Sequence, residues 1–548
     1  MRLRITLLIS ILCFGFINIL LSQSPQILWR FNTHDESFGN AAIGKLTGDG
    51  TTQIAFSCYW GDSNIYVLNA ADGSLVWKRN MGGCNDAAPI IYDVDSSGQL
   101  DVILASSCNP VLTCFNGKTG TTKWQTAFGG SDSPPSIADI DGDGKPEILV
   151  GDFEGYLNCF TADSGKLKWK VAVDTNSAIE ASPALVDING DGHPDIIVCT
   201  WAYGGNGDST AIFAYDGITH NLIWKDPRPT DKIYHGAAFG NVIENGKPQL
   251  AISSYDGHVY LLNGPNDSLI WAYPTPGLAY IGDPVAIGSL HNNGHLDMVY
   301  SNGNGEVDAL DRFGNLEWSF FLPLYESSFR GATLADVNND DTLDVVFAAS
   351  DGKVYALNGS NGSLLWDINL RADYGDSNFT LEHGAVVASF KQDDTLDVFV
   401  VGGYTDYPNI QNDFGRAYAI KIGVGTGPDW GMFQHDYTRS NCVCNPSPFT
   451  GFTEVNTPQI KVNDYPNPFS QTVTFNITLD RSLFVSVIIY DELGKTVKTF
   501  SNKTLKQGNY QFTWNGTDNS GNILSQGVYY CRILAGNTSV TKKLVFIH

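Results

Sequence analysis

Tryptophan recurs with a nearly constant period along most of the chain, and this period constrains the fold more than any other feature. Successive members of the series are 45 to 55 residues apart, and each closes a phrase such as ILW, KLKW or SLLW. An acidic or polar turn recurs at the same period. The tryptophans are Trp29, Trp77, Trp124, Trp169, Trp224, Trp271, Trp318 and Trp366, and the turns lie near Lys45, Asp93, Asp139, Asp187, Asn241, Ser289, Asp336 and Ser389. A period in the forties with several strands per unit is typical of a β-propeller.

A single repeat predicts four antiparallel strands. In residues 131–173, PPSIADI is an alternating strand, DGDGKPE is a turn, and EILVGD is a nearly continuous apolar strand. The following GYLNCFTADSGKLKWKVAV contains two more strands joined by a tight turn at Ser164 and Gly165. Because both landmarks occur eight times, we predict an all-β chain with an eight-bladed β-propeller over residues 23–440. Seven blades are the alternative if one degenerate repeat is an insertion.

The ends of the repeat region predict how the ring closes. Trp29 precedes the first acidic turn, so its strand has no blade of its own, while the last unit, 383–422, lacks a tryptophan phrase. Pairing Gln26–Asn32 beside that last unit would close the ring and remove an exposed sheet edge. We expect the tryptophans to pack between neighbouring blades, where the gap widens with radius.

The first residues predict export. Arg2 and Arg4 precede an apolar run from Ile5 to Leu21, so residues 1–22 are predicted to be a signal peptide, with a retained anchor as the alternative. No later stretch has the length of a transmembrane helix. The net charge of −25 argues against nucleic acid as a partner. Nine cysteines would remain after cleavage, and because this number is odd, complete intramolecular pairing is impossible. Their pairing stays open, although Cys114, Cys159 and Cys199 lie in apolar strands and are expected to be free buried thiols.

Several acidic turns carry side-chain oxygens at positions 1, 3, 5 and 9. Residues 139–147 read DIDGDGKPE, 187–195 read DINGDGHPD, 336–344 read DVNNDDTLD, and 93–101 read the weaker DVDSSGQLD. Such oxygens, with a backbone carbonyl from position 7, suit Ca²⁺, which accepts about six to eight oxygen ligands. We predict structural calcium here, with merely solvated turns as the alternative. The predicted ligands are Asp139, Asp141, Asp143, Glu147, Asp187, Asn189, Asp191, Asp195, Asp336, Asn338, Asp340 and Asp344, and in the weaker turn Asp93, Asp95 and Asp101. In the other turns Lys45, Ile243, His291 and Lys391 occupy ligand positions.

These repeats resemble the FG-GAP repeats of integrin-like and bacterial secreted propellers, in which calcium loops link the first two strands of a blade. The phrases SGKLKW and NGSLLW also resemble the repeats of pyrroloquinoline-quinone (PQQ) propellers. The resemblance covers residues 27–440 and implies the fold rather than one function. Quinone dehydrogenases of that type imply a disulfide between adjacent cysteines, and this chain has no adjacent pair, so we expect no PQQ.

The last residues predict a second domain. A linker rich in Pro, Thr and Asn covers 441–464, and short alternating strands over 465–548 indicate a small Ig-like β-sandwich. The motifs YPNPF, YDELGKTV, YQFTWNGTDNSGNILSQGVYY and KKLVFIH resemble the type A C-terminal sorting domain of the type IX (Por) secretion system. That resemblance implies a protein of the Bacteroidota, secreted or held at the outer cell surface after passing through the periplasm, with the type IX machinery as a partner. An accessory Ig-like adhesion domain is the alternative.

The face opposite the acidic turns is the predicted ligand surface. Connections between the second and third strands are long and aromatic at 200–210 and 402–416, and a shorter aromatic connection lies at 58–64. The aromatic side chains there suit stacking on sugars or anchoring a protein. The predicted ligand-binding residues are Tyr59, Trp60, Trp201, Tyr203, Tyr404 and Tyr407. We therefore favour a non-catalytic binding or adhesion module whose ligand is a carbohydrate or a surface protein.

A polysaccharide-degrading enzyme of the lyase type is the alternative function. Polar residues precede the innermost strand of successive repeats and would ring one mouth of the central channel, where a set of histidine, carboxylate and arginine suits acid–base chemistry. These residues are Asp86, Asp132, Glu180, His235, Asp283, Arg330, Glu382 and His383. A quinone-dependent oxidoreductase is a third and weaker hypothesis.

Overall fold

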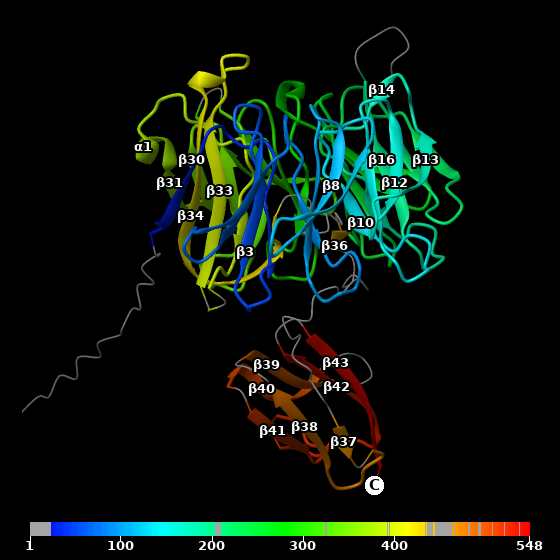
Figure 1. Ribbon diagram of the computed structural model, residues 1–548. Helices are drawn as coiled ribbons and strands as arrows, with labels where there is room; N and C mark the ends of the chain where they lie inside the picture. The colour runs from blue at the N-terminus through cyan, green and yellow to red at the C-terminus, as the bar shows by residue number, and fades with distance from the viewer. Residues whose placement is uncertain are drawn as a thin grey trace, which may run out of the picture. The chain divides into compact units, whose positions relative to one another are not determined.

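The chain folds into two compact units, Met1–Pro446 and Ser447–His548. The computed structural model describes residues 24–202, 210–323, 326–391, 393, 395–432, 435 and 442–443 of the first unit, and residues 463–465, 467–479, 483–490, 495–506, 508–519, 521–535 and 538–547 of the second. Across these residues the secondary structure is almost entirely strand (Figure 1). No helix among them has both the length and the apolar character needed to cross a bilayer.

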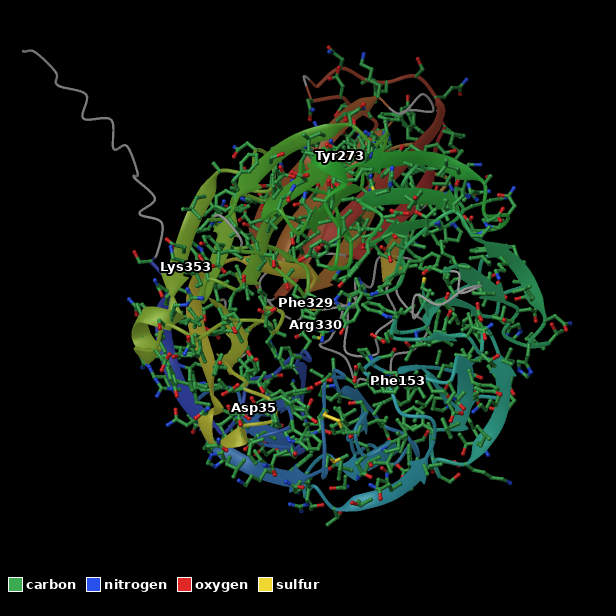
Figure 2. The ribbon with its side chains drawn as sticks, turned by 90° about the horizontal axis from the view of Figure 1, so that it is seen from above. Asp35, Phe153, Tyr273, Phe329, Arg330 and Lys353 are labelled. Atoms are coloured by element: carbon green, nitrogen blue, oxygen red, sulfur yellow. A yellow bond between two sulfur atoms is a disulfide. The ribbon has the colours of Figure 1, made fainter. Side chains whose placement is uncertain are left out.

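The first unit is built from four-stranded antiparallel sheets arranged around a central axis (Figure 2). The repeat at 131–173 forms β10 (Ser136–Ala138), β11 (Glu147–Gly151), β12 (Tyr156–Thr161) and β13 (Leu167–Ala172), paired in that order as the sequence predicts. The first strand of each sheet is innermost, because first strands of successive sheets contact one another, as β20 and β24 do. Strand β11 is buried along its whole length, which explains its continuous apolar sequence.

The other sheets repeat this order. They are formed by β2 (Ala42–Gly44), β3 (Gln53–Ser57), β4 (Asn64–Asn69) and β5 (Leu75–Asn80); by β6 (Ile90–Tyr92), β7 (Asp101–Ala105), β8 (Val111–Asn116) and β9 (Thr122–Ala127); by β15 (Ala184–Val186), β16 (Asp195–Cys199), β18 (Ile212–Tyr215) and β19 (Leu222–Asp226); by β20 (Ala238–Gly240), β21 (Gln249–Ser253), β22 (His258–Asn263) and β23 (Leu269–Pro274); by β24 (Ala286–Gly288), β25 (Asp297–Ser301), β26 (Glu306–Leu310) and β27 (Leu316–Phe321); and by β28 (Thr333–Asp336), β29 (Asp344–Ala349), β30 (Lys353–Leu357) and β31 (Leu364–Asn369). The short elements between them are β14 (Ser177–Ala178), β17 (Trp201–Ala202), η1 (Pro276–Leu278), α1 (Leu370–Tyr374) and η2 (Ile410–Asn412).

The first strand of the chain completes the last sheet. Strand β1 (Gln26–Thr33) pairs antiparallel with β34 (Phe414–Val424), which continues the sheet through β33 (Thr395–Tyr404) and β32 (Val386–Ala388). In this register Trp29 lies opposite Ala419. The predicted pairing of Gln26–Asn32 with the last unit is therefore confirmed, and both edges of the repeat region meet in one sheet.

The periodic tryptophans join neighbouring sheets, as expected. The indole nitrogen of Trp77 donates a 2.7 Å hydrogen bond to the carbonyl of Gly117 in the next sheet. Its ring lies against Gly120, which has a positive φ of 65°, and a Cβ there would be 2.5 Å from Trp77 Cδ2. Glycine is required because it combines left-handed backbone with the absence of a side chain. Equivalent indole hydrogen bonds reach the next sheet from Trp29, Trp124, Trp224, Trp271 and Trp318.

After β34 the chain returns to the innermost strands. Strand β35 (Thr426–Trp430) pairs antiparallel with β28, and β36 (Cys442–Val443) pairs parallel with β20. The peptide nitrogen of Val387 also donates to the carbonyl of Gly431, so a third innermost strand takes part. Cys442 and Val443, which the sequence places in the linker, thus belong to a propeller sheet.

The C-terminal unit is a small β-sandwich. One sheet has the order β37 (Asn463–Tyr465), β38 (Val473–Leu479), β41 (Gly508–Trp514), and the other has the order β40 (Thr496–Leu505), β39 (Leu483–Tyr490), β42 (Gly527–Ala535), β43 (Thr538–Phe546). Its core includes Trp514, Phe546 and Phe469, and Phe469 is the aromatic residue of the YPNPF motif. The rings of Phe469 and Trp514 are 5.4 Å apart, so this motif has a packing role within the unit.

Candidate functional sites

The acidic turns and the aromatic loops lie at opposite ends of the propeller. Successive strands of a sheet are antiparallel, so the connection from the first to the second strand lies at one end and the connection from the second to the third lies at the other. Residues that lead into the innermost strands share the end of the second-to-third connections. The predicted calcium ligands therefore lie together at one end, and the predicted ligand-binding aromatics lie at the end of the channel mouth.

Carboxylates converge in the acidic turns at 139–147 and 93–101. The ligand atoms of Asp139, Asp141 and Glu147 all lie within 4.8 Å of one another, and so do those of Asp93, Asp95 and Asp101. Burial raises the pKa of Glu147 and raises that of Asp101 to about 6. One carboxylate oxygen of Asp139 is buried without a hydrogen-bond partner among the described residues. Both clusters therefore have the oxygen donors of a cation site.

Each of these two clusters already contains a lysine. Lys168 Nζ is 2.7 Å from Asp141 and 2.8 Å from Glu147. Lys123 Nζ is 2.7 Å from Asp95 and 2.9 Å from Asp101. Although burial lowers the pKa of Lys168, its hydrogen bonds to the two carboxylates raise that pKa overall, which keeps the ammonium charged. Neither lysine is among the residues predicted from the sequence, but the signal is present, because Lys123 and Lys168 directly precede Trp124 and Trp169.

The turns at 187–195 and 336–344 have the same backbone arrangement without a lysine. Asp195 and Asp344 are buried, and each accepts a hydrogen bond from the peptide nitrogen of the residue that follows position 1, at 3.0 and 3.1 Å. Burial raises the pKa of Asp195 to about 6 and that of Asp344 to about 7. The positions that precede their tryptophans hold Ile223 and Leu365.

The donor set of the 336 turn fits calcium. Asn338 Oδ1 is buried and has no hydrogen-bond partner in the described part of the chain. The amide nitrogen of Asn338 lies 3.0 Å from Asp340 and 3.4 Å from Asp344, which places this side chain among the predicted carboxylate ligands. An orphaned amide oxygen among carboxylates is suited to a hard cation, which would satisfy it and neutralise the cluster.

At the opposite end, two of the predicted aromatics form an exposed pair. The rings of Trp60 and Tyr407 are 5.7 Å apart and nearly perpendicular, with 37% and 64% of their surface exposed. They come from the first and the last repeat, which are brought together by closure of the ring. Tyr59 is half-buried against Phe38, at 4.9 Å. Tyr404 is half-buried and its ring packs against Phe414 at 5.8 Å, and Tyr203 lies outside the described residues.

Trp201 belongs to a second aromatic cluster that extends over neighbouring repeats. Its ring is 5.0 Å from Tyr234 and 5.4 Å from Tyr255, and Lys232 Nζ lies 4.5 Å from its centroid. The ring of Tyr255 also contacts that of Tyr280, at 5.2 Å, and the surface of Tyr280 is 47% exposed. None of these tyrosines is in the predicted set, because Tyr255 lies in a short second-to-third connection, and Tyr234 and Tyr280 lie in the connections that lead into the next sheets.

Arg330 and Phe329 lie near the centre of the ring at this end (Figure 2). The Arg330 guanidinium is 5.7 Å from the ring of Tyr234 and 5.1 Å from that of Phe329, and its Nη1 lies 3.5 Å from His235 Nδ1. His235 Nε2 is 3.0 Å from the carbonyl of Phe329. The second aromatic cluster is therefore connected to the mouth of the channel.

Carboxyl groups from several repeats interact electrostatically with this arginine. Burial raises the pKa of Asp86, and the neighbouring Asp132 raises it further, while Arg330 opposes the shift. Burial, and then Asp132, raises the pKa of Glu180 to about 7. Burial likewise raises the pKa of Glu382, against the effect of Arg330. The carboxyl groups of four repeats and the guanidinium of a fifth thus share one electrostatic environment.

Other predicted mouth residues have local packing roles. Asp283 is 2% exposed and accepts a 2.8 Å hydrogen bond from the peptide nitrogen of Ser301. His383 is 1% exposed, with Nδ1 2.6 Å from the carbonyl of Gly384. Glu36 is absent from the predicted set, yet burial, and then Glu382, raises its pKa to about 8.

A disulfide joins Cys84 and Cys108 at this end of the molecule. Cys84 precedes strand β6, and Cys108 lies between β7 and β8, so the bond ties the mouth region to a second-to-third connection. Cys58, Cys114, Cys159 and Cys199 are free and buried, and Cys531 is also buried. The expectation for Cys114, Cys159 and Cys199 is confirmed.

Comparisons with known families support a β-propeller followed by an Ig-like domain. Residues 93–150 and 139–198 match the FG-GAP-like repeat. Residues 208–423 match the PQQ-like model described as outer membrane protein assembly factor BamB. Residues 466–539 match the FlgD Ig-like domain. The two predicted repeat resemblances are therefore both found, in successive parts of the propeller.

Individual relatives are distant. Tetrathionate hydrolase of Acidithiobacillus ferrooxidans is 24% identical over 262 residues, 46% of each chain. BamB of Yersinia pestis is 22% identical over 220 residues, 38% of this chain and 52% of the relative. BamB of Burkholderia pseudomallei is 23% identical over 289 residues, 49% of this chain and 64% of the relative. The chain thus spans about half the length of the curated relatives that it matches.

Solved structures agree on the fold alone. Quinohemoprotein alcohol dehydrogenase ADHIIG of Pseudomonas putida has a TM-score of 0.51 at 12% identity, covering 74% of this chain and 77% of the other. Sqt1 of Saccharomyces cerevisiae has a TM-score of 0.51 at 12% identity, covering 73% and 100%. An all-β propeller is the feature that these structures share with this chain.

Proposed function

We propose that this chain is a secreted or cell-surface β-propeller of eight blades that binds a carbohydrate at the mouth of its channel and does not catalyse a reaction on it. The observation that carries the proposal is the exposed pair of Trp60 and Tyr407 at the same end as the buried carboxyl groups that interact electrostatically with Arg330. Aromatic faces stack on the apolar faces of sugar rings. Carboxyl and guanidinium groups accept and donate hydrogen bonds to hydroxyl groups.

Polysaccharide binding by purified protein tests this proposal. Replacing both Trp60 and Tyr407 with alanine should reduce the affinity at least about tenfold, because aromatic contact residues commonly contribute more than about 1.4 kcal/mol to binding. Phe313→Ala is a matched control, since Phe313 is 62% exposed but lies in a turn at the opposite end. Equal binding by the double variant would refute the role of this surface. If purified protein binds a protein on a protein array and binds no glycan on a glycan array, the carbohydrate proposal is also refuted.

Catalysis at the channel mouth is the second candidate. Glu180, with a pKa of about 7, is protonated in part of the molecules at neutral pH and lies in the same electrostatic environment as Arg330. Such a carboxyl group suits general acid–base work on a glycan. If purified protein depolymerises a polysaccharide and Glu180→Gln abolishes that activity, the enzyme hypothesis replaces the binding hypothesis. Unchanged polymer length after prolonged incubation supports binding alone.

Calcium belongs to the proposal as a structural ion. We assign the strongest sites to the turns that begin at Asp187 and Asp336, because no lysine lies in them. In the turns at Asp139 and Asp93, calcium must compete with Lys168 and Lys123. Each ion would hold the connection between the first and second strands of a sheet and would stabilise the folded state by binding it preferentially. Calorimetry on chelator-treated protein tests this assignment, and no calcium uptake would refute it.

Export through the type IX system is the final part of the proposal. The support is the set of C-terminal motifs, which resemble a sorting domain, on a separate compact unit that matches the FlgD Ig-like domain. The disulfide of Cys84 and Cys108 suits an oxidising compartment. Deleting residues 465–548 should leave a folded propeller in the periplasm of a Bacteroidota host. Normal secretion of that truncated protein would refute the sorting role.

A further inference from the structure

The acidic turn of the sixth repeat has changed its ligand chemistry. This turn, 289–297, reads SLHNNGHLD, with Ser289, His291, Asn293 and Asp297 at positions 1, 3, 5 and 9. Judged as a calcium loop it has lost its carboxylates at positions 1 and 3. The structure nevertheless brings three metal-binding side chains together here. The ligand atoms of His291, Asp297 and Glu317 all lie within 4.8 Å of one another.

The third member comes from another strand. Glu317 lies on the outer strand β27 and directly precedes Trp318, the position that Lys168 holds before Trp169. In the 139 turn, the outer strand β13 provides the cation, Lys168, and position 3 of the turn provides a carboxylate, Asp141. Here the strand provides the carboxylate and position 3 provides His291. Glu317 therefore adds a ligand where Lys168 adds a competing charge.

The geometry around the imidazole suits metal binding. His291 Nε2 is 3.1 Å from both carboxylate oxygens of Glu317. In the described part of the chain, the only ion pair of either residue is the one between them, so no lysine or arginine competes for the carboxylate. Asp297 is 3% exposed, and the peptide nitrogen of Leu290 donates a 3.0 Å hydrogen bond to its Oδ2, which orients the carboxyl group.

A second observation comes from position 1 of the same turn. The hydroxyl oxygen of Ser289 is buried and lacks a hydrogen-bond partner among the residues that the structure describes. Position 1 holds a predicted cation ligand, Asp139, in the corresponding turn of the third repeat. A buried hydroxyl without a partner costs free energy unless an ion or a water satisfies it.

We propose that His291, Asp297 and Glu317 form a site for a divalent transition-metal ion, with Zn²⁺ as the best fit. One imidazole and two carboxylates match the nitrogen and oxygen ligands that Zn²⁺ takes in a tetrahedral site, and the fourth position is left for water. Calcium is disfavoured because imidazole is not among its usual ligands. The ion would cross-link the outer strand β27 to the connection between β24 and β25. It would thereby stabilise the position of the outermost strand of this sheet relative to its innermost strand.

Metal binding by the mature chain, prepared without a histidine tag and freed of metal by a chelator, tests the site. We expect one equivalent of Zn²⁺ in isothermal titration with a large excess of Ca²⁺ present. His291→Gln and Glu317→Gln should each weaken this binding at least about tenfold, as loss of a metal's supporting groups commonly does. His295→Gln is the control, because His295 lies in the same turn but pairs with Glu244.

Co²⁺ provides a spectroscopic readout that does not depend on stability. Co²⁺ bound in the site should give intense visible absorption typical of tetrahedral coordination, and His291→Gln should abolish it while His295→Gln keeps it. Three results would overturn the proposal: no Zn²⁺ bound by folded protein, equal Zn²⁺ affinity in His291→Gln, or complete displacement of Zn²⁺ by Ca²⁺. Melting curves of the variants without metal establish that they are folded.

Discussion

Replacing Lys168 with methionine should convert the turn at 139–147 into a strong calcium site. Methionine keeps most of the length and apolar surface of the lysine stem but removes the ammonium that lies 2.8 Å from Glu147 and 2.7 Å from Asp141. Among the described ion pairs, Lys168 is the only cation paired with these carboxylates, so the variant leaves them without an ion-pair partner. We expect the variant to be less stable than the wild type without calcium, and to regain that stability when calcium is added.

The magnitude follows from the burial of the groups. At an effective dielectric constant of about 20, two unit charges 2.8 Å apart interact by about 6 kcal/mol before desolvation is counted. The lysine side chain is 29% exposed and Glu147 is 2% exposed, so the net contribution lies between that of a surface pair and that of a buried pair. We take the net contribution of this ion pair to be about 1 to 3 kcal/mol. Calcium no longer has to displace the ammonium, so its affinity should rise about 5- to 150-fold.

Titration calorimetry with calcium, and melting temperatures with and without the ion, measure both effects. Lys170→Met is the matched control, because Lys170 lies on the same strand but pairs with Asp152, outside the turn. The control should lose its own ion pair without any change in calcium affinity. Calcium affinity and stoichiometry in Lys168→Met equal to those of the wild type would refute the reasoning, and would mean that the carboxylates form a solvated turn.

Three further predictions concern the turns, the sheet contacts and the channel mouth. Ile223→Lys should place an ammonium in the 187 turn, and calorimetry should then show one calcium fewer; unchanged stoichiometry would contradict this. Gly120→Ala should cost about 2 to 5 kcal/mol in chemical unfolding, because it adds a clash with Trp77 to a left-handed backbone. Gly246→Ala is the control: its φ is 76° with open space around it, so it should cost only about 1 to 2 kcal/mol. Equal losses of unfolding free energy in the two variants would refute the role of Gly120 in packing against Trp77. Glu36 has a folded pKa of about 8, above that of the unfolded chain, so stability should fall as pH rises from about 4.5 to 8, and Glu36→Gln should flatten that dependence of the melting temperature.

The repeat pattern of the sequence was sufficient to predict the sheets because its determinants are local. Alternation of apolar residues, a glycine turn and a tryptophan phrase all lie within one repeat, and each repeat buries its apolar strands against copies of itself. Pairing of β1 with the last unit followed from the same pattern, since one strand was left over at the start of the repeats and the last unit lacked its outer strand. The convergence of carboxylates within a nine-residue turn is also local, and so the clusters at Asp93 and Asp139 were predictable.

Side-chain contacts between distant segments were decided by the tertiary structure. Lys168 and Glu317 occupy equivalent positions before a tryptophan, but their contact with a turn more than twenty residues earlier depends on strand register, because a shift of one residue would reverse the face on which they lie. Asp86, Asp132, Glu180 and Arg330 come from different repeats, and only the closed ring brings them into one electrostatic environment. The exposure of Tyr407 and the packing of Tyr404 on Phe414 follow from how one loop folds back. Sequence period determines which elements form, whereas the distances that create a site depend on the packing of all of them together.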